Sequence, residues 1–256
     1  AGTNGKGSVS AYAATALRFA GYRVGRYISP TIFKYRERIQ VNDRCITVKA
    51  LCEGMERIRA VCDGMTAEGL PHPTPFEMET ALGFLYFKEK HCDIVVLETG
   101  MGGLLDATNV VENTVAAVFT SISRDHMRFL GDTLGEIAGQ KAGIMKRGCI
   151  AVSAAQKPEA LAVLERQAET LGCKLVVNEP EKIKNIRYGL ERQRFDYGGL
   201  RGLEISLAGR FQIENAALAV DALQALGGKG FPVDEAALRR GLLQTKWPGR
   251  FTVLAK

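Results

Sequence analysis

The segment Gly2-Thr3-Asn4-Gly5-Lys6-Gly7-Ser8 runs directly into SVSAYAATALRFA, residues 8–20, whose apolar spacing predicts a helix. Glycines allow successive backbone N–H groups to point at one anion, and the N-terminus of the helix adds a partial positive charge. Lys6 supplies a full charge, and the Ser8 hydroxyl can reach a phosphate-bound metal. The complete GxxxxGK[ST] spacing is not testable, because its first glycine would precede residue 1 and an extra glycine separates the lysine from the serine. The segment therefore predicts a phosphate-binding loop, with a helix-entry turn as the alternative.

Outward from this loop, helical periodicity alternates with short β-branched runs, which is typical of βαβ units around a parallel sheet. The predicted helices span residues 8–20, 50–67, 75–90, 134–142, 158–171, 212–226 and 233–243. The predicted strands span residues 23–27, 93–98, 115–121 and 149–153, and the apolar runs 93–98 and 115–121 are typical of strands covered on both faces. Residues 174–208 alternate with polar turns and predict a small antiparallel sheet. We expect an α/β fold: a mostly parallel sheet with helices on both faces, and this small sheet beside it.

Composition narrows the class of protein. The chain has 256 residues, 46% of them hydrophobic, and 34 basic against 28 acidic side chains give a formal charge of +6. The basic residues are dispersed, which argues against nucleic acid and favours small polyanions. Six cysteines occur without a CxxC pair, and no apolar run is long enough for a membrane span. We expect a soluble, cytoplasmic globular protein without a zinc site or a disulfide framework, associated with neither nucleic acid nor membrane.

Polar residues follow three of the predicted strands. Ser29 follows the strand at 23–27, Glu98 ends the strand at 93–98, and Asp125 and His126 come after the strand at 115–121. Open α/β sheets bind ligands at the carboxyl ends of their strands, and oxygen donors suit Mg²⁺. Together with the glycine loop, these residues predict a magnesium–nucleotide site.

Each of these residues also has a simpler interpretation. Glu98 could interact with the amide groups of the glycine-rich turn that follows it, GMGG at residues 100–103. His126 could be a hydrogen-bonded loop residue and Ser29 a turn serine before a proline, while Lys141 alone would be a solvated lysine near a helix end. Both ends of the chain interrupt a pattern, so we expect the middle of a longer polypeptide.

Seven motifs, taken together and in order, carry a resemblance. They are GTNGKGS, YISP with RERIQVN, TPFEMETALGFLYF, VLETGMGGLLDATNVV, SISRDHMRFLGDTLGEIAGQKAGIMKRG, GRFQIENAALAV and WPGRF. This set resembles the folylpolyglutamate synthase/dihydrofolate synthase family of the Mur ligase superfamily. The resemblance implies an ATP-dependent ligase that converts a pterin-linked carboxylate to an acyl phosphate, which the amino group of L-glutamate then attacks. It also implies a central-domain-like unit over residues 1–245 that lacks its initial strand, and the start of a C-terminal ligase domain over 246–256.

The resemblance also assigns roles to positions. The loop residues that would bind ATP are Thr3, Asn4, Gly5, Lys6, Gly7 and Ser8, and the nucleotide would also contact Asn215 and Arg250. The ligands of two Mg²⁺ ions would be Ser29, Glu98, His126 and Lys141, with Lys141 carbamylated. The catalytic set would be Lys6, Glu98, His126 and Lys141. The segments that would contact folate or dihydropteroate are Thr74, Pro75, Phe76 and Glu77, and Leu105, Asp106 and Ala107. The family pattern leaves room for a monovalent cation and favours a monomer.

Two other functions stay open at this point. One is a different Mur-type ligase, such as one that acts on a UDP-muramoyl peptide, although TPFE and LDATN favour a pterin. The other is an isolated ATP-binding module, for which we expect weak ATP binding and negligible ligation without a C-terminal domain. Thr31, Leu104, Gln140 and Phe211 depart from residues common in the family, and none of them is a predicted phosphate or metal group.

Overall fold

In the computed structural model, which describes residues 1–249, parallel strands form two ladders. In the first, β1 (Val24–Tyr27) pairs in parallel with β4 (Ile94–Leu97), and β2 (Ile39–Val41) and β3 (Arg44–Cys45) extend this sheet with antiparallel pairs. In the second, β5 (Ala116–Phe119), β6 (Ile150–Ser153) and β7 (Lys174–Val177) are all parallel. A third, antiparallel sheet consists of β8 (Lys184–Arg187), β9 (Gln193–Tyr197) and β10 (Leu200–Ile205).

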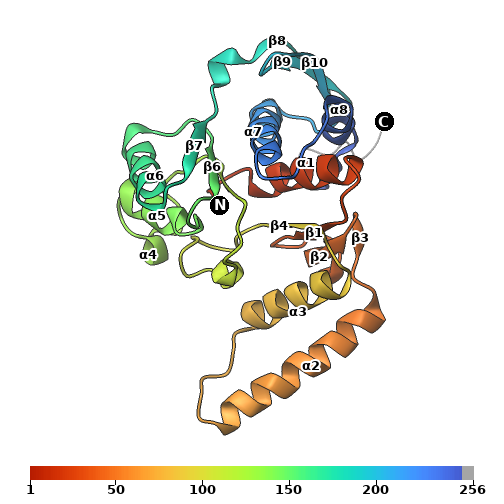
Figure 1. Cartoon of the computed structure of the whole chain (residues 1–256), viewed down its shortest axis with the longest axis vertical. Coiled ribbons are helices and arrows are strands. Elements are labelled where there is room, and N and C mark those ends of the chain that lie inside the picture. Colours follow the sequence, from red (N-terminus) through yellow and green to blue (C-terminus); the bar gives the residue numbers. More distant parts are fainter. Residues whose placement is uncertain (250–256) are drawn as a thin grey trace.

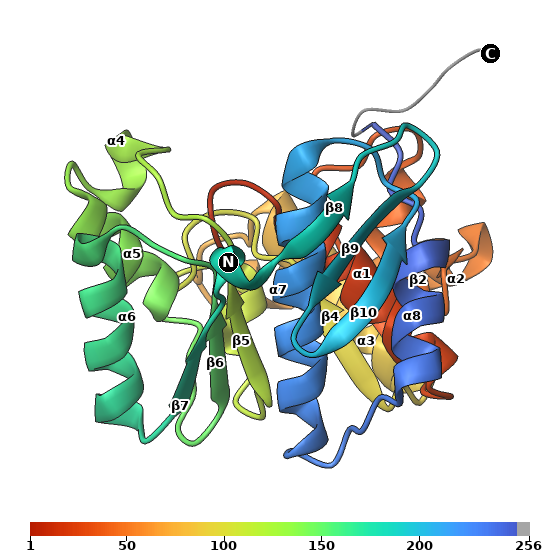
Figure 2. The ribbon, with the colours of Figure 1, turned by 90° about the horizontal axis from the view of Figure 1, so that it is seen from above.

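Helices cover both faces of the parallel strands (Figures 1 and 2). On one face, α1 (Lys6–Phe19), α7 (Arg210–Gly227) and α8 (Glu235–Gln244) share one core with strands from all three sheets. On the other face, α5 (Leu134–Ala142) and α6 (Pro158–Leu171) pack on the β5–β7 sheet. The first sheet is covered by α2 (Val48–Ala67) and α3 (Pro75–Glu89), which project from the body in Figure 1. These contacts confirm the predicted α/β fold with helices on both faces.

Several helix ends follow from local chemistry. The Thr74 hydroxyl accepts a hydrogen bond from the Glu77 amide, and the Glu77 carboxylate accepts one from the Thr74 amide, which makes a capping box with Pro75 at the first helical position of α3. Thr133 and Glu136 cap α5 in the same way. Short elements complete the chain: α4 (Met127–Leu130) and the 3₁₀ turns Tyr35–Arg38, Ala107–Val110 and Pro180–Lys182.

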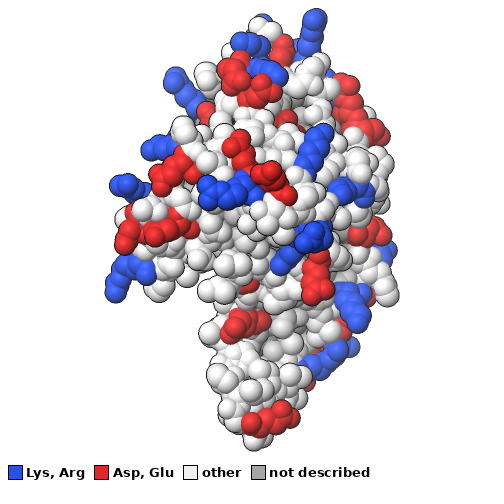
Figure 3. Space-filling view, turned by 60° about the vertical axis from the view of Figure 1, so that its left-hand side comes forward, with Lys and Arg blue, Asp and Glu red and all other residues white. Residues whose placement is uncertain are grey.

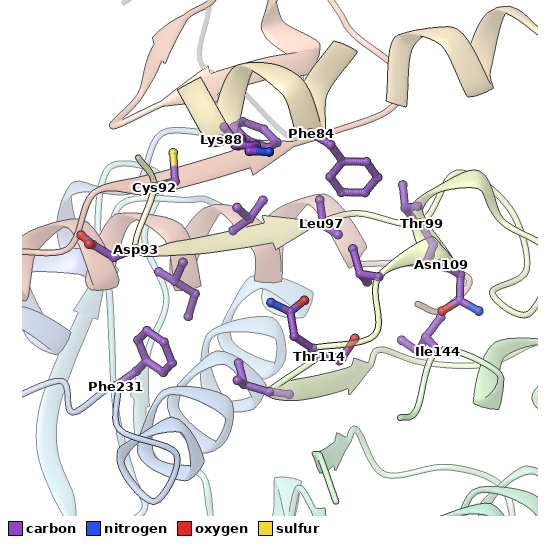
Figure 4. Close-up of a pocket in the computed structure, with 18 residues that line it drawn as sticks. Phe84, Lys88, Cys92, Asp93, Leu97, Thr99, Asn109, Thr114, Ile144 and Phe231 are labelled. Atoms are coloured by element: carbon purple, nitrogen blue, oxygen red, sulfur yellow. The ribbon is translucent and has the colours of Figure 1, made fainter. Parts of the chain in front are cut away.

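Two sequence predictions need correction. The antiparallel sheet begins at Lys184 and not at residue 174, because β7 (Lys174–Val177) joins the parallel sheet beside β6. The two apolar strands are also less covered than predicted, since Val95, Val96 and Leu97 of β4 and Ala116 and Val118 of β5 are only half-buried. Val96 lines a cavity of about 140 Å³ between β4 and β5, and Val95 and Leu97 also line a cavity of about 410 Å³ between these strands. Figure 4 shows this cavity between side chains of α3, β4 and the segment that enters β5.

A buried polar network attaches the antiparallel sheet to the body. The Asp221 carboxylate of α7 accepts a hydrogen bond from the Tyr197 hydroxyl of β9 at 2.8 Å. It accepts another, at 2.6 Å, from the side-chain amide of Asn178, which lies just after β7. Burial raises the pKa of Asp221, while these two donors oppose that shift. The network therefore fixes three elements around one carboxylate.

The surface carries charges of both signs. Basic and acidic side chains are interspersed on the face in Figure 3, without a continuous basic patch. None of the helices within residues 1–249 combines the length and the apolar character that crossing a bilayer requires. All six cysteines are free, including Cys149 and Cys173, whose Sγ atoms lie 3.5 Å apart.

The contact between α1 and α8 gives a stability prediction. A Cβ atom added at Gly241 would lie 2.7 Å from the Ala16 backbone nitrogen, so Gly241→Ala must push two helices apart. We expect the free energy of unfolding, measured in urea, to fall by about 1–3 kcal/mol. Gly64→Ala in α2 is the control, because a Cβ there meets nothing within 4 Å, and we expect it to be neutral or stabilising by about 0.5–1 kcal/mol. Equal stability of Gly241→Ala and the wild type would contradict the close packing.

Candidate nucleotide-binding site

The glycine loop forms the N-terminus of α1, and each of its glycines faces a different neighbour. A Cβ atom at Gly2 would lie 3.0 Å from Thr120 Cβ, one at Gly5 would lie 3.2 Å from Asn215 Cγ, and one at Gly7 would lie 2.9 Å from Trp247 Cε2. Gly5 also has φ +92°, which disfavours other residues. The loop therefore needs glycines for close approach as well as for its backbone conformation.

Hydrogen bonds hold the loop against the segment that leaves β5. The Thr3 amide donates to the Ser121 carbonyl at 2.8 Å. The Thr3 hydroxyl donates to the Ser123 carbonyl at 3.1 Å and accepts from the Ser123 amide at 3.0 Å. These bonds fix the loop at the carboxyl end of a parallel strand.

Helix α7 holds the other side of the loop. The Gln212 side-chain amide donates to the buried Ser8 hydroxyl at 3.1 Å, and Asn215 donates to the Gln212 side-chain carbonyl at 3.3 Å. Asn215, which the sequence predicts to reach the nucleotide, thus stands beside Gly5 at the start of α1. The residues GRFQIEN at the start of α7 provide this wall.

A cavity of about 690 Å³ opens at the loop. Its lining includes the end of every described parallel strand except β1: Glu98 after β4, Thr120 and Ser121 after β5, Ala154 and Ala155 after β6, and Asn178 after β7. The remaining lining residues are Thr3, Asn4, Gly5, Lys6, Gly7, Ser8, Pro180, Phe211, Glu214, Asn215 and Leu218. This is the position at which open α/β sheets bind their ligands.

Charges converge on this edge of the sheet. The positively charged Lys6 ammonium donates a hydrogen bond to the Gly2 carbonyl at 3.0 Å. The Glu98 carboxylate belongs to a residue that is only 7% exposed. Lys141, at the end of α5, is 3% exposed. Burial, and next the positive charge of Lys6, lower the pKa of Lys141 to about 8, while Asp125 opposes this shift. A lysine interpreted from the sequence alone as solvated is therefore buried and under the influence of a second ammonium group.

The predicted metal ligands occupy separate positions around the edge. Ser29 is half-buried after β1 and precedes Pro30 through a cis peptide bond. The His126 ring is 54% exposed, and its Nε2 lies 3.7 Å from the Asp125 carboxylate. Of the four predicted ligands, Glu98 alone is in the lining of the cavity described above. Within residues 1–249, no three His, Cys, Asp or Glu side chains form a metal-binding group, so the metal ligand set stays a prediction.

The two segments predicted to contact a pterin meet at Gly100. A Cβ atom at Gly100 would lie 3.1 Å from the Phe76 ring and 3.3 Å from the Asp106 carboxylate. Asp106 accepts hydrogen bonds from the Met101 and Thr108 amides, and the Glu77 carboxylate is engaged in the cap of α3. Leu105 is 89% exposed. Asp106 and Glu77 thus shape their own segments, and the apolar groups of this region include Phe76 and Leu105 as well as the exposed Met101 and Leu104.

Several residues that line the cavity or contact the glycine loop were not predicted from the sequence. Thr120 and Ser121 could have been found by the rule that selected Glu98, since they also follow a strand. Asn178 was missed because β7 was assigned to the wrong sheet. Trp247 and Gln212 carry no chemical signal of their own and become relevant only through their contacts with Gly7 and Ser8. Arg250 lies outside the described residues.

The fold and the site define a phosphate-loop α/β domain, in which a glycine-rich loop opens a helix at the carboxyl edge of parallel strands. Residues 1–223 match the model of the Mur ligase middle domain, and the chain belongs to that family.

Two comparisons place the chain more closely within the family. The dihydrofolate synthase/folylpolyglutamate synthase of Bacillus subtilis is 38% identical over 99% of this chain and 60% of its own length. The apo form of L. casei folylpolyglutamate synthase (FPGS) superposes with a TM-score of 0.93 at 32% identity, over 100% of this chain and 64% of that one.

A second similar structure contains ligands. An FPGS–AMPPCP–folate complex gives a TM-score of 0.91 at 33% identity, over 97% of this chain and 62% of that one. The chain thus spans about 60% of the length of the curated relative described above.

Proposed function

We propose that this chain binds ATP through the glycine loop and serves a ligase that joins L-glutamate to the carboxylate of folate or dihydropteroate. The observation that carries the proposal is the single cavity in which the loop, Lys6, Glu98 and Asn215 meet at the ends of parallel strands. The names of the relatives support the substrates, and the AMPPCP and folate in a similar structure support the nucleotide and the pterin. The charge distribution and the reduced cysteines agree with a cytoplasmic location.

The residues of the loop suit a triphosphate. The backbone N–H groups at the start of α1 and the helix dipole favour an anion, and Lys6 adds a charge that can leave the Gly2 carbonyl for a phosphate oxygen. Thr3 and Ser8 are held in place by Ser123 and Gln212, so the loop is ordered by its neighbours. Such preorganisation is what phosphoryl transfer requires of the protein.

The residues beside the loop fit Mg²⁺. Glu98 offers a carboxylate that is more than nine-tenths buried at the wall of the cavity, and oxygen is the ligand that Mg²⁺ prefers. Ser29 would complete one ion site with Glu98, and Glu98 with His126 and a carbamylated Lys141 would hold the second. Bound there, Mg²⁺ would neutralise charge on the transferred phosphoryl group.

Lys141 fits carbamylation on physical grounds. A lysine amine must be neutral to attack CO₂, and a pKa of about 8 leaves a useful neutral fraction near neutral pH. The reaction forms an N–C bond, releases the amine proton and replaces an ammonium beside Lys6 with an anion. The change would therefore remove the repulsion between the buried Lys141 and the half-buried Lys6, and supply a further oxygen ligand.

The proposed reaction has a direct test. A protein containing this chain, incubated with ATP, L-glutamate and either dihydropteroate or tetrahydrofolate, should release ADP only when both pterin and glutamate are present. Product mass should increase by one glutamyl unit for each ADP. Absence of ADP release with both pterins would count against the folate ligase, and ADP release with a UDP-muramoyl peptide would support the other Mur-type activity.

A further inference from the structure

Gly7 has no conformational reason to be a glycine. It lies in the first turn of α1, and its φ is not among the positive values found at Gly2 and Gly5. Alanine in such a position would ordinarily favour the helix by about 0.5–1 kcal/mol. The reason for glycine is therefore close approach, and the neighbour is Trp247: an added Cβ would overlap Cζ2 of the indole and lie 2.9 Å from Cε2 and 3.1 Å from Cη2.

Trp247 is held firmly where it meets the loop. Its side chain is 8% exposed and belongs to the core formed by α1, α7 and α8. Arg26 of β1 places its guanidinium 5.7 Å from the indole centroid, a cation–π distance. Just before it, the Thr245 hydroxyl donates to the Gly241 carbonyl at 2.7 Å, and the Thr245 carbonyl accepts from the Ser206 hydroxyl at 2.9 Å. The indole thus has a defined position against Gly7, in the core that α1 shares with α7 and α8.

We propose that Trp247 is a positioning residue for the phosphate-binding loop, which it contacts at Gly7, while Gln212 and Asn215 contact the loop at Ser8 and Gly5. This inference rests on the proposed nucleotide binding. The loop contacts both α7 and the residues that follow α8. The indole determines the direction of the backbone N–H groups of Gly7 and Ser8. Displacement of the indole therefore misaligns the amides that face the nucleotide, and occupancy of the loop changes the environment of the indole.

A double-mutant cycle tests this arrangement. The affinity for a nonhydrolysable ATP analogue with Mg²⁺ is measured by calorimetry for the wild type, Gly7→Ala, Trp247→Leu and the double variant. We expect Gly7→Ala to weaken binding by about tenfold or more, and Trp247→Leu by less. The double variant should bind about as tightly as Trp247→Leu, because removal of the indole makes room for the new methyl group. Gly64→Ala, in open space on α2, is the matched control and should bind as the wild type does.

Fluorescence gives an independent readout, because Trp247 is the single tryptophan of the chain. Its emission should shift on addition of the analogue to the wild type, and Gly7→Ala should increase its quenching by acrylamide, because the new methyl group displaces the indole. A purely structural indole would show no shift with the analogue.

The outcomes separate the two proposals. If the wild type binds the analogue but the losses of the single variants multiply in the double variant, Trp247 does not position the loop and the nucleotide site stands. A methyl group that blocks the phosphates directly would give this result. If the wild type does not bind the analogue, the proposed function fails, and the positioning role fails with it.

Discussion

Lys6→Ala is expected to reduce kcat for pterin-dependent ADP release by about 10²–10³-fold, the loss typical when one preorganised electrostatic partner of a reacting group is removed. Lys6 is the charged residue of the glycine loop, and it lines the cavity with Glu98. In the structure its ammonium donates to the Gly2 carbonyl at 3.0 Å, so the charge is already held at the loop. In the transition state of phosphoryl transfer, negative charge is spread over the phosphate oxygens. The Lys6 ammonium would face these oxygens and stabilise that charge.

The control for Lys6→Ala is replacement of a lysine that lies outside the cavity. Lys49 at the start of α2 is 83% exposed and forms a surface ion pair with Glu53, and Lys49→Ala should leave kcat unchanged. Thermal midpoints of both variants should stay near that of the wild type, which separates lost catalysis from lost folding. Unchanged kcat in Lys6→Ala would remove the phosphate-loop assignment.

Lys141→Ala is expected to impair ligation as severely as the loss of Lys6, because it removes the proposed carbamate ligand. Short carboxylates such as formate or acetate should restore part of the activity by filling the space of the carbamate. Incubation of the wild type with ¹³C-bicarbonate should give a carbamate carbon signal that is missing from the variant. A plain amine at Lys141 in the metal-loaded enzyme would contradict carbamylation.

Replacement of Lys141 should raise the stability of the fold, although it lowers activity. The folded state holds the pKa of Lys141 at about 8, below the ordinary 10.5, so an ammonium there destabilises the fold at lower pH. In protein freed of metal and bicarbonate, Lys141→Met should therefore be more stable than the wild type at pH 7. The difference should shrink as pH rises from about 8 to 10.5, where the unfolded chain also loses the proton.

The comparison with Lys49→Met makes this test specific to burial. Lys49 is 83% exposed, so its replacement removes no buried group and should leave the thermal midpoint near that of the wild type. A Lys141→Met variant that is less stable than the wild type throughout pH 7–10.5 would show that the amine has favourable partners in the fold. Its loss of activity could then no longer be assigned to a metal ligand.

The bounds of several helices were predictable from the sequence, because neighbouring residues determine them. Helix α5 (Leu134–Ala142) and helix α6 (Pro158–Leu171) have the predicted bounds, and α3 begins at Pro75 as predicted, where Thr74 caps it. Apolar periodicity and capping act over three or four residues, so a single sequence contains them. The glycine loop at the start of α1 was predictable for the same reason.

Other features depend on partners distant in the sequence. Residues 174–177 lie at the start of a stretch with alternating segments and polar turns, but they pair in parallel with β6, and that pairing decides their sheet. Lys141 resembles a solvated lysine in the sequence, and only the packing around α5 buries it near Lys6.

The sequence by itself determined the α/β fold class, most element bounds and the chemistry of the loop, since residue type and spacing carry that information. The tertiary structure decided which neighbour each loop glycine meets, how deeply Glu98 and Lys141 are buried, and that Trp247 touches Gly7. Those features arise from close contacts and desolvation between segments up to 240 residues apart (247 − 7), and no local pattern encodes them.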